Sequence, residues 1–108
     1  SVDLEDVLLK HEAVLEVAVI AIDDPRWQER PLAILRVREG SYSDALPGAL
    51  RSYLLDKVAK FWVPEYWVQV ENIPKTSVGK IDKKQLRNML AAGSLAVQKH
   101  TDFGRVDE

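Results

Sequence analysis

The sequence has 108 residues, of which 46% are hydrophobic and 30% charged, a balance typical of one small globular domain. The formal net charge of −2 argues against a nucleic-acid partner, and no apolar run is long enough for a membrane span. Cysteine is absent, which excludes disulfides and thiolate metal sites and suits the reducing cytoplasm, where we expect the protein to lie. The lack of an initiator methionine leads us to expect a fragment or a processed form.

The first part of the chain predicts a helix followed by a β-hairpin. Ser1 suits a helix N-cap, and the leucines and valines that follow it recur at helical spacing. The run AVLEVAVIAI, residues 13–22, is apolar on both alternating faces and predicts a strand in the middle of a sheet. Residues 23–25 (DDP) turn the chain, and PLAILRVR, residues 31–38, predicts a second strand that pairs with the first.

The second part predicts a helix, a strand and a further helix. Residues 47–58 have leucines at helical spacing, with proline in the first turn, where it is tolerated. Pro64 ends this helical region, and EYWVQVE, residues 65–71, predicts a third strand. Asp82, with glutamine three residues later, forms a capping-box pattern at the start of the last helix, and Gly93 suits its end.

Together these elements predict an α+β fold in which a small three-stranded sheet, a hairpin plus one further strand, is covered by about three helices. We expect residues 1–92 to form a single domain. Residues 93–108 lose apolar periodicity and are expected to form a mobile C-terminal tail. The tryptophans Trp27, Trp62 and Trp67 are expected in the core or at a domain interface rather than stacked on a base.

A glycine–lysine pair lies in the segment IPKTSVGKIDKK, residues 73–84. A phosphate-binding P-loop needs a first glycine and a final hydroxyl, but Pro74 and Ile81 occupy those positions, which argues against a self-contained nucleotide site. What remains is a loop that we expect to be flexible, with Lys75 near its start and Lys80 at its end. Such a loop suits the delivery of positive charge to a site on another domain.

The segment PKTSVGKIDKKQLR, residues 74–87, resembles the C-terminal signature of the adenylate-forming superfamily, which includes acyl-CoA synthetases, aryl-CoA ligases, luciferases and peptide-synthetase adenylation domains. The preceding VAKFWVP segment and the helix–strand–DDP–strand order extend the resemblance over nearly all of residues 1–92, and it is strongest for fatty-acyl-CoA synthetases. Two residues depart from the family pattern: Glu12 stands where proline is common, and Gln28 stands where glycine is common before Glu29.

The resemblance implies a lid that closes over a large N-terminal domain of the same polypeptide, which binds ATP, Mg²⁺ and a carboxylic acid, here a fatty acid. The implied reaction forms an acyl-adenylate and then a thioester with CoA. Lys80 is implied as the catalytic lysine, which offsets the repulsion between carboxylate and α-phosphate. The implied substrate or nucleotide contacts are Lys75, Thr76, Ser77 and Gly79. Candidate contacts with the large domain are Trp27, Glu29 and Lys83, and no metal ligand is expected in this chain.

Three further points complete these expectations. A lysine acetyltransferase is a candidate regulatory partner, because acetylation would remove the charge of Lys80. The chain alone is expected to be inactive. Two alternatives stay open: the lid of another adenylate-forming enzyme, such as an aryl-CoA ligase or a peptide synthetase, or a free-standing α+β module that binds a protein or an anion without catalysis.

Overall fold

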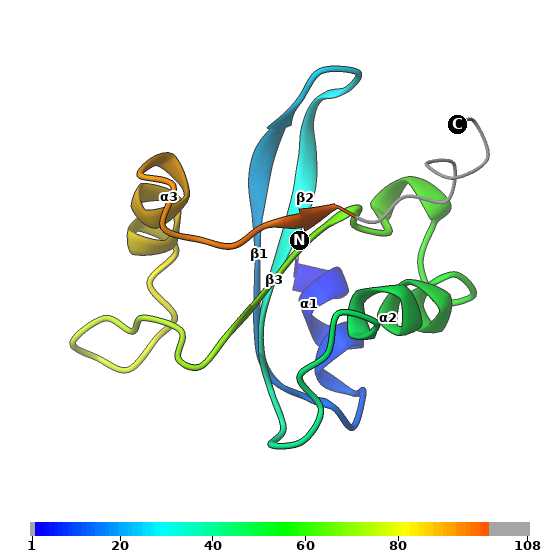
Figure 1. The fold of residues 1–108 in the computed structure, drawn as a ribbon, viewed down its shortest axis with the longest axis horizontal. Coiled ribbons are helices and arrows are strands. Elements are labelled where there is room, and N and C mark those ends of the chain that lie inside the picture. Colours follow the sequence, from blue (N-terminus) through cyan, green and yellow to red (C-terminus); the bar gives the residue numbers. More distant parts are fainter. Residues whose placement is uncertain (1, 100–108) are drawn as a thin grey trace.

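The computed structural model describes residues 2–99 of the chain (Figure 1). In chain order its elements are α1 (Val2–Leu9), β1 (Val14–Asp24), β2 (Gln28–Val37), α2 (Leu46–Leu54), the 3₁₀ helix η1 (Lys60–Trp62), β3 (Tyr66–Val70), α3 (Lys83–Ala91) and β4 (Gln98–Lys99). The predicted helices, hairpin and third strand are all present, and the fold is α+β. The predicted N-cap at Ser1 lies outside the described residues. Within residues 2–99, no helix has the length and apolar character needed to cross a bilayer.

The strands form one mixed sheet in the order β1-β2-β3-β4. β1 and β2 pair as the predicted antiparallel hairpin, β2 and β3 run parallel, and β3 pairs with β4 antiparallel. The prediction of three strands is therefore wrong, because Gln98 and Lys99 add a fourth. These two residues lie in the segment 93–108 that was expected to form a tail, and a strand this short leaves no periodic pattern. Residues 100–108 lie outside the described part of the chain.

β1 lies at an edge of the sheet and not in its middle, so the prediction from its apolar pattern is wrong. Hydrophobic periodicity shows which faces of a strand are covered, but it does not show whether both edges are hydrogen-bonded. At the free edge of β1, the backbone N–H of Val19 donates a hydrogen bond of 2.8 Å to Oε2 of Glu5 in α1. A helix side chain thus satisfies part of an otherwise open edge.

The sheet separates two hydrophobic clusters. Figure 1 shows α3 on one side of the sheet and α1 and α2 on the other. One face packs against α1 and α2, where Trp67 is completely buried together with Leu8 and Leu50. The other face packs against α3 and includes Val68 and Leu86. Neighbouring residues of β3 therefore serve opposite clusters, as strand geometry requires. Trp67 is a core residue, in agreement with the expectation for the tryptophans.

Two buried arginines hold the segment between η1 and β3. Arg30 in β2 donates a hydrogen bond of 3.1 Å to the carbonyl of Val63, and Arg51 in α2 donates to the carbonyl of Pro64. The indole N–H of Trp67 also donates to the Pro64 carbonyl, at 3.0 Å. These donors satisfy buried carbonyls in an irregular segment, which would otherwise destabilise the fold. No sequence pattern predicts that these arginines are buried.

Candidate functional site

Lys80 belongs to a small hairpin before α3, residues 74–82, which we call the Lys80 hairpin. Lys75 and Ile81 form an isolated antiparallel bridge across it, and the N–H of Thr76 donates a hydrogen bond of 2.7 Å to the carbonyl of Lys80. In Figure 1 the hairpin extends from the sheet on the side that carries α3, away from α1 and α2. Lys80 is thus presented on a projection with backbone pairing of its own.

The tip of the Lys80 hairpin is a tight turn. The N–H of Gly79 donates a hydrogen bond of 2.9 Å to the carbonyl of Thr76, and Gly79 has a φ of +86°. No atom lies within 4 Å of the position that a Cβ would take. Glycine is therefore required here by the backbone conformation and not by a lack of space. The hydroxyl of Thr76 accepts from the N–H of Lys80 at 3.3 Å. The loop that the sequence predicted as flexible is therefore hydrogen-bonded, with Ser77 exposed in the turn.

The side chain of Lys80 is exposed. Among residues 2–99, no carboxylate forms a salt bridge with its ammonium group. Two open grooves of about 700 Å³, one between α1 and η1 beside Trp62 and one at the end of β2 beside Tyr42, are not lined by the Lys80 hairpin. The ammonium group is therefore available to a negatively charged group outside this domain.

The two lysines that flank Lys80 are paired within the domain. Lys75 Nζ lies 2.8 Å from Oε2 of Glu16 in β1. Lys83 Nζ, in the first turn of α3, lies 2.8 Å from Oε2 of Glu5 in α1. Lys75 was predicted as a substrate contact and Lys83 as a contact with the large domain. In the structure each lysine has a carboxylate partner from an element that is distant in sequence, and both predicted roles stay predictions.

Glu16 is a doubly paired carboxylate. Its Oε1 accepts a hydrogen bond of 2.8 Å from Nε of Arg36 in the facing strand, while its Oε2 pairs with Lys75. The hydrogen bond from Lys75 is the main cause that lowers the pKa of Glu16; partial burial opposes it and Arg36 reinforces it. Glu16 is therefore ionised at neutral pH and links the Lys80 hairpin to both strands of the main hairpin.

Trp27 and Glu29 lie at the tip of the β1–β2 hairpin, and the structure does not bring them together with Lys80 (Figure 1). The side chain of Trp27 is 50% exposed and lies edge to face with Phe61, with ring centroids 5.7 Å apart. Phe61 packs in the same manner against Trp62, which is 48% exposed. These three rings form a second surface, which we call the aromatic surface. No sequence pattern indicated that Phe61 belongs to it.

Polar groups anchor this hairpin tip to β3. Oδ1 of Asp24 accepts from the N–H groups of Arg26 and Trp27 at 2.7 and 3.1 Å, and Oδ2 accepts from the hydroxyl of Tyr66 at 2.8 Å. Burial opposes the ionisation of Asp24, but these hydrogen bonds outweigh it and lower its pKa. Burial, reinforced by Asp24, raises the pKa of Tyr66 to about 12. The side chain of Arg26 also pairs with the buried Glu65 at 3.2 Å.

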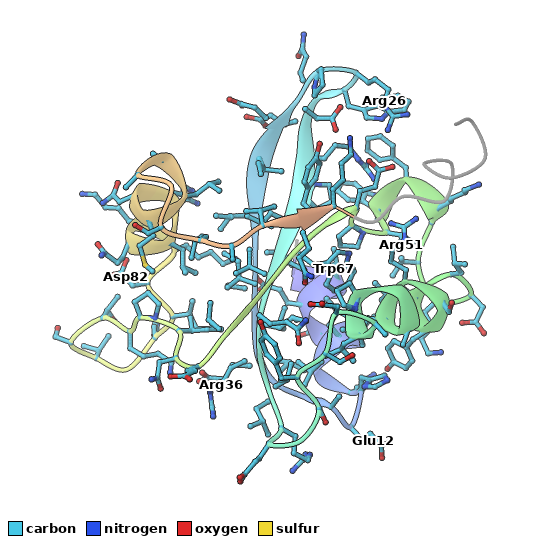
Figure 2. The ribbon with its side chains drawn as sticks, in the orientation of Figure 1. Glu12, Arg26, Arg36, Arg51, Trp67 and Asp82 are labelled. Carbon is cyan, nitrogen blue, oxygen red and sulfur yellow. The ribbon has the colours of Figure 1, made fainter. Side chains whose placement is uncertain are left out.

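Figure 2 shows Arg26 at the β1–β2 hairpin tip and Asp82 at the start of α3, on opposite sides of the sheet. The carboxylate of Asp82 accepts a hydrogen bond of 3.0 Å from the N–H of Gln85, which confirms the predicted N-cap. No sequence pattern indicated the polar contacts that hold the turn at Arg26. Residues 23–25 were predicted only as turn formers. A buried aspartate and a surface aspartate look alike in a turn sequence.

Gln28 adopts a φ of +72°, a left-handed conformation that glycine favours. The resemblance identified this position as one where glycine is common. The turn thus adopts a backbone conformation that glycine favours, although this position carries glutamine. Gln28 maintains it with a side chain attached, at a cost in strain.

Within the described part of the chain, no group of three or more histidine, aspartate or glutamate side chains is arranged to hold a metal ion. The chemical groups brought together at the Lys80 hairpin are one exposed ammonium, the hydroxyls of its turn, and two internally paired lysines. Such a set can bind or stabilise an anion.

Comparisons with known proteins identify relatives of this chain. The family model of the AMP-binding enzyme C-terminal domain matches residues 3–80. A long-chain-fatty-acid–CoA ligase of Thermus thermophilus is 46% identical over 88 residues, which cover 81% of this chain and 16% of that protein. A 2-methylpropanoate–CoA ligase of Humulus lupulus is 36% identical over 89 residues, which cover 82% of this chain and 16% of that protein.

A solved structure of a Mycobacterium tuberculosis fatty acyl CoA synthetase has the same fold, with a TM-score of 0.75 and 30% identity over 84% of this chain and 18% of that one. The chain spans 16% of the length of the two curated relatives. The family model covers all of β1, β2, α2 and β3 and reaches Lys80 itself. The chain therefore belongs to the AMP-binding enzyme C-terminal domain family.

Proposed function

We propose that this chain is the lid domain of an AMP-forming acyl-CoA ligase, and that Lys80 acts in an active site formed with a large N-terminal domain. The exposed ammonium group of Lys80 carries the proposal. It follows a hydrogen-bonded turn, is exposed, and has no carboxylate partner among the described residues. A lysine placed in this way suits a role at a site on another domain.

The first half-reaction of the proposed enzyme brings two anions together. A carboxylate oxygen of the acid attacks the α-phosphorus of ATP; a new O–P bond forms, and pyrophosphate leaves with the electrons of the broken P–O bond. The ammonium group of Lys80 lies between the carboxylate and the α-phosphate and stabilises the charge of the transition state. One such interaction typically contributes about 3–4 kcal/mol.

In the second half-reaction, the thiol of CoA releases its proton to the solvent and its sulfur attacks the acyl carbon. The bond from that carbon to the phosphate oxygen breaks, and AMP leaves with the electrons of that bond. This step does not bring a carboxylate and a phosphate together, so it does not need the positive charge of Lys80. One movable lid can serve both steps if it presents Lys80 in the first and another surface in the second. We propose that the large domain contacts the aromatic surface and the neighbouring Glu29 when the Lys80 hairpin is withdrawn.

The remaining loop residues have different proposed roles. Thr76 and Gly79 shape the turn through their own hydrogen bonds and backbone angle, so their effect on catalysis is through the placement of Lys80. Ser77 is exposed at the tip and is the proposed nucleotide contact of this set. Mg²⁺ and most of the ATP are proposed to bind to the large domain.

A fatty acid is the proposed carboxylic acid, and CoA the proposed thiol. The Thermus thermophilus relative is a long-chain-fatty-acid–CoA ligase, whereas the Humulus lupulus relative is named for 2-methylpropanoate. The acid therefore differs among proteins that share this domain, as expected if the acyl group binds to the large domain. We propose that the enzyme works in the cytoplasm, which suits a chain without cysteine.

The test is to mix this chain with a separately produced large domain and to measure each half-reaction by itself. Lys80→Ala should reduce adenylate formation by about 10²–10³-fold and spare thioester formation from supplied acyl-adenylate. Lys84→Ala is the matched control, because Lys84 is also exposed and lies only four residues away. Equal losses in both half-reactions would refute the role of Lys80. A mixture inactive with every acid would instead favour a free-standing binding module.

A further inference from the structure

The Lys80 hairpin is attached to the domain at both of its ends by ion pairs. At its start, Lys75 pairs with Glu16 of β1, and just after its end, Lys83 pairs with Glu5 of α1, each at 2.8 Å. Both carboxylates precede the hairpin by more than half of the chain, so neither pair is a local helix or turn contact. The Glu16 and Glu5 side chains are 22% and 19% exposed and the Lys75 and Lys83 side chains 37% and 38%, so solvent screens both pairs in part.

Each of the two carboxylates is itself fixed by a second donor. Glu16 accepts from Nε of Arg36 in β2, and Glu5 accepts from the backbone N–H of Val19 in β1, both at 2.8 Å. A carboxylate held by the sheet in this way cannot follow a moving lysine freely. The ion pairs therefore define where the hairpin stands relative to β1 and β2.

Apolar packing already secures the chain on either side of the hairpin. Ile73, just before it, is 3% exposed, and Leu86 in α3 is completely buried in the same cluster. This packing extends along the segment to Ile81, whereas the turn residues 76–80 are exposed. The ion pairs add charged contacts to β1 at Lys75 and to α1 at Lys83, just after the hairpin, and so restrict its tilt.

The same two ion pairs also determine which lysines of the segment have a carboxylate partner. Lys75 and Lys83 are neutralised by internal carboxylates, whereas Lys80 between them has no such partner within residues 2–99. Within the hairpin itself, residues 74–82, Lys80 is thus the lysine whose charge is not compensated by a carboxylate of the described residues. Residues that do not contact Lys80 therefore determine its position, and their ion pairs leave its charge without a carboxylate partner within residues 2–99.

We propose that Glu5 and Glu16 are positioning residues for Lys80: through their ion pairs with Lys83 and Lys75, they fix the reach of the Lys80 hairpin and leave Lys80 as its reactive cation. The inference rests on the proposed function, because it concerns the half-reaction assigned to Lys80. A displacement of about 1 Å can reduce the rate of a positioned reaction by about 100-fold. Loss of either pair therefore has a measurable effect on adenylation.

The experiment uses the intact enzyme and the variants Glu16→Gln and Glu5→Gln. Each should reduce the kcat of adenylate formation by about 10–100-fold, whereas thioester formation from supplied acyl-adenylate should be retained. The matched control is Glu12→Gln, the same chemical change at an exposed residue between α1 and β1 (Figure 2). Parallel loss of both half-reactions would show a general structural role and overturn the proposal. Adenylation equal to that of the control would also overturn it.

A double-mutant cycle tests whether Glu16 acts through Lys75. If it does, Lys75→Gln should have the same effect as Glu16→Gln, and the double variant should be no slower than either single variant. Losses that multiply in the double variant would overturn the assignment to this pair. The cycle also covers the case in which one single variant folds poorly, because the other carries the same prediction.

Lys80→Ala separates the failure of this inference from the failure of the proposed function. If Lys80→Ala leaves adenylation intact, the proposed function fails. If Lys80→Ala abolishes adenylation while the glutamate variants match Glu12→Gln, only the positioning role fails.

Discussion

The hydroxyl of Tyr66 donates a hydrogen bond of 2.8 Å to the buried carboxylate of Asp24 and so joins the start of β3 to the tip of the β1–β2 hairpin. The same carboxylate accepts from two backbone N–H groups of the turn. The carboxylate of Asp24 therefore connects the turn, the end of β1 and the start of β3. The aromatic surface begins at the next residues of this turn, so its position depends on this bond.

Replacing Tyr66 by phenylalanine should remove a sensitivity to alkaline pH. The pKa of Tyr66 rises from 10.0 to about 12 on folding, mainly through burial. Because the folded pKa is raised, the contribution to stability is complete below pH 10 and is lost as pH rises from about 10 to about 12. In this range the free energy of unfolding should fall by about 1.4 kcal/mol per pH unit more in the wild type than in Tyr66→Phe. Denaturant unfolding at several pH values measures this, and parallel profiles would contradict the assigned shift.

Gln28→Gly should stabilise the domain. Glycine adopts the φ of +72° without the strain of a side chain, although it also raises the entropy of the unfolded chain. We expect a net gain of about 0.5–1 kcal/mol in the free energy of unfolding. Glu29→Gly, one residue further into β2, is the control and should destabilise by a similar amount. A loss at both positions would show that the positive φ of Gln28 carries no strain.

Leu86→Ala should weaken the attachment of α3. Leu86 is the only buried residue of this helix, and it is completely buried against the sheet. Large-to-small changes at such sites cost about 2–5 kcal/mol. The exposed neighbour Arg87 is the control, and Arg87→Ala should change the free energy of unfolding by less than about 0.5 kcal/mol. A cost below about 1 kcal/mol for Leu86→Ala would mean that other contacts hold α3 in place.

Acetylation of Lys80 should switch off adenylation. The modification removes the positive charge that the proposed transition state needs. Acetyl-lysine placed site-specifically at position 80 of the intact enzyme should abolish adenylate formation, and removal of the acetyl group should restore it. Acetyl-lysine at Lys84 is the control and should have little effect. Undiminished adenylation with modified Lys80 would exclude this form of regulation by an acetyltransferase.

The chain alone should fold but should not exchange pyrophosphate with ATP in the presence of a fatty acid. Its two buried clusters are contained within residues 4–97, whereas Lys80 lacks the reactants that the large domain is proposed to bind. Circular dichroism and a pyrophosphate exchange assay measure the two expectations. Robust exchange by the chain would contradict the proposed lid role.

Much of the fold could be predicted because local patterns and tertiary contacts agree. The apolar runs of β1 and β2, separated by a DDP turn, predicted the hairpin, and the capping pattern at Asp82 predicted the start of α3. Lys80 could be identified because glycine and lysine lie next to each other in a distinctive motif. In each case the information lies within a few consecutive residues.

Other features depend on residues that are far apart in the chain. The position of β1 at the sheet edge, the fourth strand at Gln98, and the burial of Arg30 and Arg51 follow from which elements meet. A periodic pattern shows which faces of an element are buried. It does not show which strand pairs with the edge of another, or which groups bind a charged side chain.

The Lys80 hairpin shows this division most clearly. Its residue types alone indicated an exposed cation at the end of a turn, because glycine, threonine and lysine have local conformational and chemical preferences. Folding brought Glu16 beside Lys75 of the hairpin and Glu5 beside the following Lys83, whereas Lys80 gained no carboxylate partner within residues 2–99. Charge pairing requires atoms within a few ångströms of each other, and only the folded chain brings them that close.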